Sequence, residues 1–422
     1  MNSYAAVILA ALVLDWGLNL VADLLNLRAL SPELPGEAAG VHDAAAYRRS
    51  QVYTRTRTRL GLVASTASLG ALLAFWFAGG FPALDRWCTR VASGPVLAGL
   101  LFIGTLGLAQ AALSLPFRLY STFVIENRFG FNRTTPRTFA ADLLKGTLLA
   151  VAIGAPLLAA ILYFFQYAGP SAWLYCWAIT TVVLLAVHFV APTWIIPLFN
   201  TLTPLPDGEL RQAILDYARG VAFPVSGIFV IDGSRRSTKA NAFFAGFGAT
   251  KRIALFDTLI ERQTTAEMVG VLAHEIGHYK LHHVPKRLAL SIAHTGILFA
   301  LLSVLLSHHG LFAAFGMDRP SVHAGLVFFA LFYTPVELVL AVVLNALSRR
   351  DESAADRFAA RTTARPDTLA SALKRLASEQ LANLTPHPFY VALHYSHPPL
   401  LARLAALRAL QAPTAAPGAT GS

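Results

Sequence analysis

The stretch "VLAHEIGHYKLHH" (271–283) carries the pattern His-Glu-x-x-His, with His274, Glu275 and His278 at its fixed positions. On a helix, residues four apart project from one face, about 6 Å from each other. Two neutral imidazoles in that arrangement can share one tetrahedral zinc ion, while the intervening glutamate can reach a water molecule at the metal without ligating it. In a chain with 13 histidines the spacing alone could arise by chance. A catalytic zinc site also needs a third protein ligand.

The segment "NALSRRDESAADRFAA" (345–360) offers that ligand in Glu352, with Asp356 one helical turn later. We assign Glu352 to the metal and Asp356 to a hydrogen bond that orients a ligand histidine. Taken by itself, the segment favours a solvated helix on which Arg349 and Arg350 pair with the acids. The metal interpretation therefore depends on whether this segment and the histidine pair lie on one side of a membrane.

The composition predicts a membrane protein. Of 422 residues, 55% are hydrophobic and only 14% are charged, whereas soluble domains carry about 25% charged residues. A spanning helix needs about 20 mostly apolar residues. Seven segments meet that requirement: 4–26, 60–80, 94–117, 142–166, 172–198, 287–308 and 321–347.

The arginines predict the orientation of these spans. Arginine is concentrated in segments 27–59 and 118–141, which fall on the same side as 199–286 and the chain from 348 onward. The positive-inside rule places that side in the cytoplasm. The His-Glu-x-x-His helix and Glu352 can therefore share one site. The arginine-rich and alanine-rich composition suggests a bacterial source, and hence the inner membrane.

Five polar residues interrupt the apolar spans. Such side chains are costly in lipid and usually face a bundle interior or a wet cavity. Hydrogen bonds between neighbouring helices are the simpler alternative for any one of them. Together they favour a water-accessible interior: Asp15, Gln110, His188, His294 and Glu337.

The insert between spans five and six has the pattern of a small α+β module. We expect a helix over 205–220, strands over 227–231, 241–247 and 252–256, and a helix that starts at the capping box Thr264-x-x-Glu267. That last helix is predicted to run to about His283. The predicted organisation is spans one to five (1–198), catalytic insert (199–286), spans six and seven (287–347), helical segment with the third ligand (348–410) and disordered tail (411–422).

The predicted chemistry is peptide hydrolysis by a zinc-activated water, with Glu275 as general base. His397 and Arg403 in "LHYSHPPLLARL" (393–404) are candidate donors to the oxyanion, and His394 remains an alternative to His397. Four other histidines are interpreted as residues of the membrane interface: His282, His283, His308 and His309.

The strand "NAFFAGF" (241–247) has two interpretations. Zinc proteases commonly hold the substrate antiparallel to an edge strand, and Asn241 and Ala242 would then bind the peptide main chain. An ordinary core strand fits the same residues.

Several stretches beyond His-Glu-x-x-His resemble the type-I CAAX prenyl protease family over roughly residues 40–410. They are "RRSQVYTRTRTRLGL" (48–62), "YSTFVIENRFGFNRTTPRTF" (120–139), "IIPLFNTLTPLPDGELR" (195–211), "KANAFFAGFG" (239–248), "VLAHEIGHYK" (271–280), "NALSRRDESAAD" (345–356) and "YSHPPLLARL" (395–404).

The resemblance implies a mainly α membrane protein whose seven helices enclose a water-filled chamber, with a cytoplasmic zincin-like (gluzincin) module. It implies one Zn²⁺ per chain held by His274, His278 and Glu352, with Glu275 catalytic. Eukaryotic members cleave a prenylated C-terminal Cys-a-a-X tripeptide. The tail of this chain lacks the basic retrieval signal of an endoplasmic-reticulum resident.

We therefore expect a monomeric membrane zinc endopeptidase that acts on peptide or protein substrates, prenylated or membrane-embedded, in contact with lipid and without nucleic acid. One alternative is quality control of membrane proteins without a prenyl requirement. Another is a non-catalytic scaffold or transporter with a structural zinc. Glu275 argues against that last reading, because a structural site fills its fourth position with another ligand and needs no base.

Overall fold

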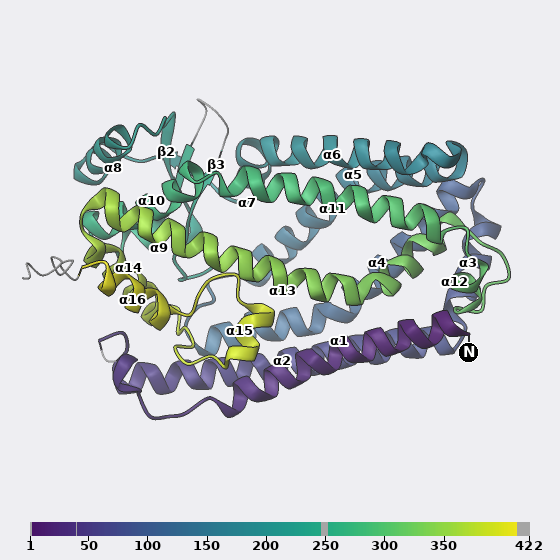
Figure 1. Cartoon of the computed structure of the whole chain (residues 1–422), viewed down its shortest axis with the longest axis horizontal. Coiled ribbons are helices and arrows are strands. Elements are labelled where there is room, and N and C mark those ends of the chain that lie inside the picture. Colours follow the sequence, from purple (N-terminus) through teal and green to yellow (C-terminus); the bar gives the residue numbers. More distant parts are fainter. Residues whose placement is uncertain (1, 39, 246–251, 412–422) are drawn as a thin grey trace, which may run out of the picture. The chain divides into compact units, whose positions relative to one another are not determined.

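The computed structural model describes residues 2–38, 40–245 and 252–411. The chain divides into two compact units. The helical unit contains Met1–Leu24, Thr56–Phe199 and Pro285–Ala341, and the sheet unit contains Leu25–Arg55, Asn200–Val284 and Val342–Ser422. Figure 1 shows their helices and strands coloured along the sequence. The sheet unit thus combines three stretches that are far apart in the chain.

The described residues include seven helical stretches long and apolar enough to cross a membrane, which confirms the predicted number. Each overlaps one predicted span. They are α1 (Ser3–Arg28), α2 (Ala44–Phe77), α4 with its continuation (Pro95–Glu126), α5 (Pro136–Tyr167), the stretch that contains α6 (Gly169–Phe199), α11 (His283–Leu305) and α13 (Val322–Thr363).

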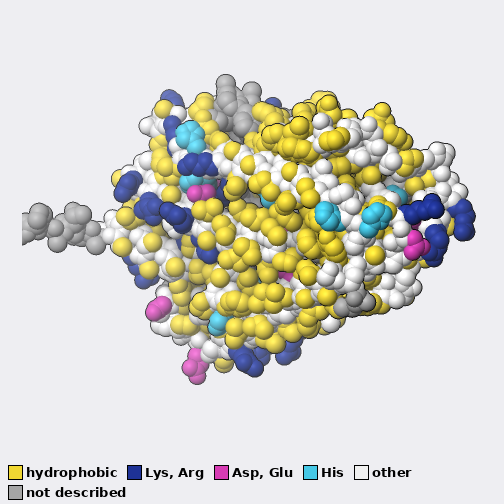
Figure 2. Space-filling view, turned by 45° about the vertical axis from the view of Figure 1, so that its right-hand side comes forward, with side chains coloured by type: hydrophobic (Ala, Val, Ile, Leu, Met, Phe, Trp, Pro, Cys, Tyr) yellow, Lys and Arg dark blue, Asp and Glu magenta, His cyan; other side chains and the backbone are white. Residues whose placement is uncertain are grey.

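The surface of these helices is apolar, as a lipid environment requires. Large aliphatic side chains such as Leu108, Val182 and Val304 are more than half exposed. Figure 2 shows how widely hydrophobic side chains cover the face that it displays. A water-soluble protein would bury such residues.

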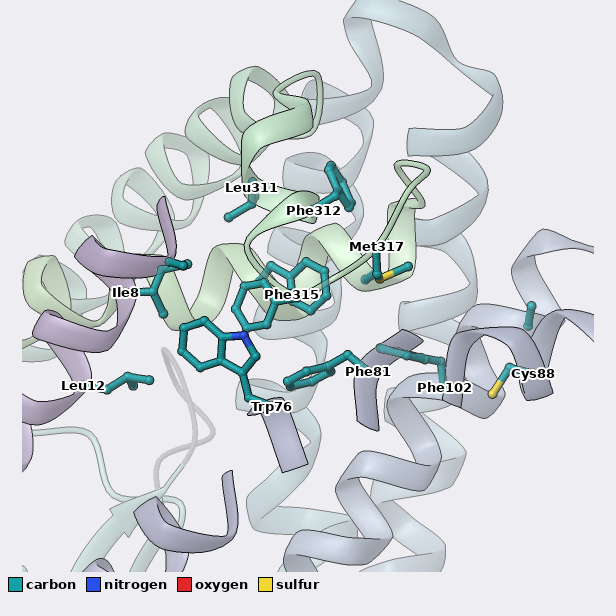
Figure 3. Close-up of a cluster of buried hydrophobic side chains, with 14 residues drawn as sticks. Ile8, Leu12, Trp76, Phe81, Cys88, Phe102, Leu311, Phe312, Phe315 and Met317 are labelled. Atoms are coloured by element: carbon teal, nitrogen blue, oxygen red, sulfur yellow. The ribbon is translucent and has the colours of Figure 1, made fainter. Parts of the chain in front are cut away.

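Aromatic side chains fill one end of the helical unit. Phe315 stacks on Phe328 with ring centroids 3.8 Å apart, and Phe81 contacts Phe315 edge to face. Trp76 lies against Phe315 and donates from Nε1 to the carbonyl of Ala314 at 2.9 Å. Figure 3 shows this cluster, which the short helices α3 (Gly80–Val91) and α12 (His309–Ala313) help to close. Shape-specific packing replaces the hydrophobic effect, which is weak between helices in lipid.

The described residues of the sheet unit form a four-stranded sheet in the order β1-β2-β4-β3. Strands β2 (Gly227–Ile231) and β4 (Arg252–Phe256) are parallel and coincide with two predicted strands. Strand β3 (Ala242–Ala245) pairs antiparallel with β4 at one edge, and the predicted strand residues 246–247 lie outside the described residues. The antiparallel strand β1 (Leu202–Pro204) was not predicted, because three residues are too few for a periodic pattern.

Helix α10 (Thr265–Lys280) carries the His-Glu-x-x-His motif and packs against α8 (Glu209–Gly220) and α14 (Pro366–Glu379). The predicted capping box is present: Thr264 Oγ1 accepts from Glu267 N, and a Glu267 carboxylate oxygen accepts from Thr264 N. The other Glu267 oxygen accepts from Ser371 Oγ of α14 at 2.6 Å. One acidic residue therefore both starts α10 and fixes it to α14.

The predicted end of this helix at His283 was wrong. Helix α10 ends at Lys280, and α11 begins at His283. Between them His282 has a φ of 57°, in the left-handed region. A residue in that conformation ends an α-helix, and the chain turns before α11 starts.

Replacing Thr264 with Ala should remove the first acceptor of α10 and lower the free energy of unfolding by about 1 kcal/mol. The neighbouring Thr265→Ala variant keeps the capping box and is the matched control. Thermal unfolding of the two purified proteins measures the difference. Equal stability would show that the cap contributes little to α10.

Candidate metal centre

Helices α10 and α13 bring three side chains that could hold a metal ion together within the sheet unit. The Nε2 atoms of His274 and His278 are 3.2 Å apart, and each lies 3.3 Å from an oxygen of Glu352. Ligands at about 2.0–2.1 Å around a tetrahedral zinc ion are separated by about 3.3 Å. The three donor atoms therefore have the spacing of three corners of a zinc tetrahedron.

Burial and charge also fit a cation. Only 3% of Glu352 is exposed. Among the described residues its Oε2 atom has no hydrogen-bond partner of acceptable geometry. Burial opposes a charge on His274, yet the carboxylates of Asp356 and Glu352 outweigh it and raise the pKa of His274 to about 9. A buried, unsatisfied carboxylate beside two imidazoles is a donor set that zinc satisfies.

Asp356 lies one turn beyond Glu352 and contacts the other nitrogen of the same histidine. The distance from His274 Nδ1 to Asp356 Oδ1 is 2.8 Å. Arg403 of α16 (Leu400–Ala409) donates to both Asp356 oxygens, from Nε at 2.8 Å and from Nη2 at 2.7 Å. Asp356 thereby directs His274 Nε2 toward Glu352. Arg403, expected near the oxyanion, is held by Asp356.

His278 has a partner that sequence reasoning missed. Its Nδ1 atom lies 2.9 Å from His283 Nδ1, and His283 Nε2 lies 3.5 Å from Asp351 Oδ1. His283 is 4% exposed, so its interpretation as an interfacial residue was wrong. The left-handed residue His282 turns the chain and brings His283 beside His278, a contact that neither helical nor strand periodicity predicts.

The remaining predicted residues surround a cavity of about 170 Å³. Asn241, Glu275, His397 and Arg403 line it together with His274. Burial raises the pKa of Glu275. Ala242 is described by its backbone only, as the first residue of β3.

The loop before α16 brings His397 rather than His394 to this cavity. His397 Nε2 lies 3.4 Å from Glu352 Oε2, whereas the His394 ring packs on Tyr390 at the end of α15 (Pro388–His394). Helix α13 holds the loop through Arg349, whose Nη1 donates to the carbonyls of Val391 and Tyr395. The loop is thus held by a side chain of α13 that donates to backbone carbonyls of the segment before α16.

Gly277, between the two motif histidines along α10, permits the close approach of α13. A Cβ atom at this position would lie 3.2 Å from Ala355 Cα, 3.2 Å from Phe358 Cδ1 and 3.3 Å from the Ala355 carbonyl oxygen. These contacts are tight, and two of them involve backbone atoms that move only with the helix. A glycine here lets Glu352 reach both histidines.

Comparison with known proteins agrees with this arrangement. Residues 23–201 match the family model "CAAX prenyl protease N-terminal, five membrane helices", and residues 204–411 match peptidase family M48. The chain is 36% identical to the CAAX prenyl protease 1 homolog of Arabidopsis thaliana, covering 91% of this chain and 93% of that protein. It is 32% identical to the Homo sapiens homolog, covering 95% of each. The crystal structure of S. mikatae Ste24p is similar with a TM-score of 0.92, at 30% identity, covering 96% of this chain and 99% of that one.

The membrane helices, the zincin-like module and these similarities define a membrane zinc metalloendopeptidase. The chain belongs to peptidase family M48, among the CAAX prenyl protease 1 homologues. This confirms the family that the sequence resembled, and it rules out the scaffold alternative.

A Gly277→Ala variant should separate α10 from α13 by a few tenths of an ångström and destabilise the protein by about 1–3 kcal/mol. The same shift pulls Glu352 away from the histidines, so the variant should also lose metal faster to a chelator. Gly220→Ala at the end of α8 is the control, because a Cβ there meets nothing within 4 Å. Thermal unfolding and metal content after dialysis measure both effects. A variant as stable and as rich in metal as the control would contradict the packing argument.

Proposed function

We propose that this protein removes the C-terminal tripeptide of prenylated peptides at the cytoplasmic face of a bacterial inner membrane. The observation that carries the proposal is the cavity that Asn241, Glu275 and His397 line together with His274, one of the three converging metal-ligating groups. The curated relatives are named CAAX prenyl proteases, which supports the substrate class. The arginine-rich segments are predicted to lie on the same side of the membrane as residues 199–286. By the positive-inside rule this supports a cytoplasmic location for the candidate site.

His274, His278 and Glu352 would hold one zinc ion per chain. Bound zinc would supply Lewis acidity, which makes a water molecule more acidic and the scissile carbonyl more electrophilic. Asp356 would keep His274 in the tautomer with a free Nε2, and Arg403 would keep Asp356 ionised and in place.

Glu275 would accept the proton of the attacking water and deliver it to the leaving amine. Its side chain lines the same cavity as His274, close to the ligands without being one of the three converging groups. Its burial keeps competing bulk water away from the carboxylate.

His397 would donate to the oxyanion that forms at the scissile carbonyl. Its side chain is 60% exposed and lies at the cavity, so the ring can reach a bound peptide. Arg403 would instead act through Asp356, because both of its donating nitrogens contact that carboxylate.

The edge of β3 would hold the substrate main chain. Asn241 lies opposite Phe256 in the register, and its carbonyl accepts from Phe256 N at 3.1 Å. In an antiparallel pair the residues alternate, so the N–H and C=O groups of Ala242 point away from β4. An extended peptide can bind there antiparallel to β3. Leu373 and Leu376 of α14 line the same cavity and suit apolar residues after the cleavage site.

Glu275→Gln should retain zinc and lose turnover by roughly 1000-fold, because an amide cannot accept the proton. Glu352→Ala should instead lose zinc, because two histidines alone hold it poorly. Metal analysis and cleavage of a fluorogenic peptide distinguish the two variants. Full activity in Glu275→Gln would exclude Glu275 as the base, and parental metal content in Glu352→Ala would exclude that ligand.

The prenyl requirement can be measured with a matched pair of peptides, farnesylated and unmodified, cleaved by the enzyme in liposomes. Burial of an isoprenoid chain should raise kcat/KM for the farnesylated peptide by roughly tenfold or more. The Glu275→Gln protein gives the background rate. Equal rates for the two peptides would favour general quality control of membrane proteins.

A further inference from the structure

A second cavity of the sheet unit lies along α13, beside residues that take no part in the candidate metal site. We propose that this basic cavity, lined by Arg349, Arg350 and Arg357, binds the phosphate headgroup of an anionic membrane lipid. The described residues that line it do not include the three groups that could hold a metal ion. The proposal is therefore independent of peptide cleavage.

The lining of this cavity carries an excess of positive charge. Its volume is about 810 Å³, and Arg349, Arg350 and Arg357 all line it. The single acid among its described lining residues is Asp351, which lies 3.5 Å from His283 Nε2. An anion that enters the cavity thus meets three guanidinium groups and one carboxylate, and that carboxylate already has a histidine beside it.

Two of the three arginines have no protein group to balance their charge. Across residues 2–38, 40–245 and 252–411, the side chains of Arg350 and Arg357 form no ion pair or hydrogen bond, and both residues are exposed. Arg349 differs, because its Nη1 donates to the carbonyls of Val391 and Tyr395 and is thereby held in place. Guanidinium groups present a planar fork of donors that matches the oxygens of a phosphate. Arg350 and Arg357 are therefore available to bind one.

The two available arginines continue an apolar stripe along α13. Val343, Leu347, Arg350 and Arg357 are spaced by four, three and seven residues, which places them on one face of the helix. Val343 is 49% exposed and Leu347 is 42% exposed, and Leu347 also lines the cavity. Glu352 follows Val343 by about two and a half turns of helix, so it lies on the opposite face. The stripe thus passes from exposed hydrocarbon to exposed positive charge.

The change from apolar to charged residues along α13 corresponds to the surface of a membrane. Residues 338–348 contain no charged side chain, and the charged part of the helix begins at Arg349. A helix of 42 residues is about 63 Å long, roughly twice the hydrocarbon thickness of a bilayer, so α13 extends beyond it. Arginines near the end of a spanning segment reach the level of the lipid headgroups. The cavity therefore lies where phosphate groups of lipids are found.

The apolar half of the stripe favours a lipid over a free phosphate ion. A phosphate ion would contact only the arginines, whereas the acyl chains of a lipid would also cover Val343 and Leu347. Each arginine near a membrane surface raises the affinity for anionic lipid by about fivefold. One anionic lipid should therefore bind here more tightly than a neutral one.

Native mass spectrometry of the full-length protein in a neutral detergent can count the lipids that it binds. The probes are phosphatidylglycerol, phosphatidylcholine with the same acyl chains, and inorganic phosphate. Phosphatidylcholine should bind roughly tenfold more weakly than phosphatidylglycerol, because its choline cation cancels the charge of the phosphate. In the double variant Arg350→Gln, Arg357→Gln, the affinity for phosphatidylglycerol should fall about 25-fold. Inorganic phosphate at the concentration of the lipid should not displace it.

Arg408→Gln on α16 is the matched control, because it removes an equal charge from an exposed position that does not line the cavity. It should bind phosphatidylglycerol like the parent, and thermal unfolding verifies that each variant is folded. Equal affinity of parent and double variant for phosphatidylglycerol, or equal affinity of the parent for both lipids, would overturn the site. Displacement of the lipid by an equal concentration of inorganic phosphate would overturn the assignment to a lipid.

Discussion

The carboxylate of Glu352 is buried almost completely beside two imidazoles, and this charge constrains the rest of the site. A buried carboxylate is costly unless cationic or hydrogen-bonding partners surround it. The close approach of α10 and α13 at Gly277 supplies the two histidines as partners. Asp356 in turn contacts His274, and Arg403 pairs with Asp356, because each buried charge requires a partner of opposite sign.

One uninterrupted helix, α13, contains both the seventh apolar stretch and Glu352, the third residue of the candidate metal site. A helix satisfies its own backbone hydrogen bonds, so it can leave an apolar environment and enter a polar one without a break. The same helix anchors the loop of His397 through Arg349. Strand β3 lies at the edge of the sheet, and the Ala240 carbonyl just before it accepts from Gln380 Nε2. The candidate metal site and the proposed substrate edge therefore lie on helices and a strand, which suits a site that must hold its geometry.

Much of the protein follows from sequence alone, because it rests on local chemistry. Seven apolar stretches predict seven spanning helices, since only a helix of that length satisfies its backbone in lipid. The capping box at Thr264 predicts the start of α10, and four-residue spacing predicts that His274 and His278 share a face. Regular hydrophobic strands gave β2 and β4 with their observed bounds. The tail 412–422 lies outside the described residues, and its predicted disorder stays a prediction.

Other features depend on contacts between residues far apart in the chain, which no local pattern encodes. Sequence left His394 and His397 as alternatives, and hydrogen bonds from the Arg349 side chain to backbone carbonyls help to place His397 at the cavity. It assigned His283 to the membrane interface, whereas the turn at His282 places it against His278. Arg403 bonds to Asp356 across 47 residues. Sequence periodicity determines on which face of a helix or strand a side chain lies. Tertiary packing determines which other residues contact that face.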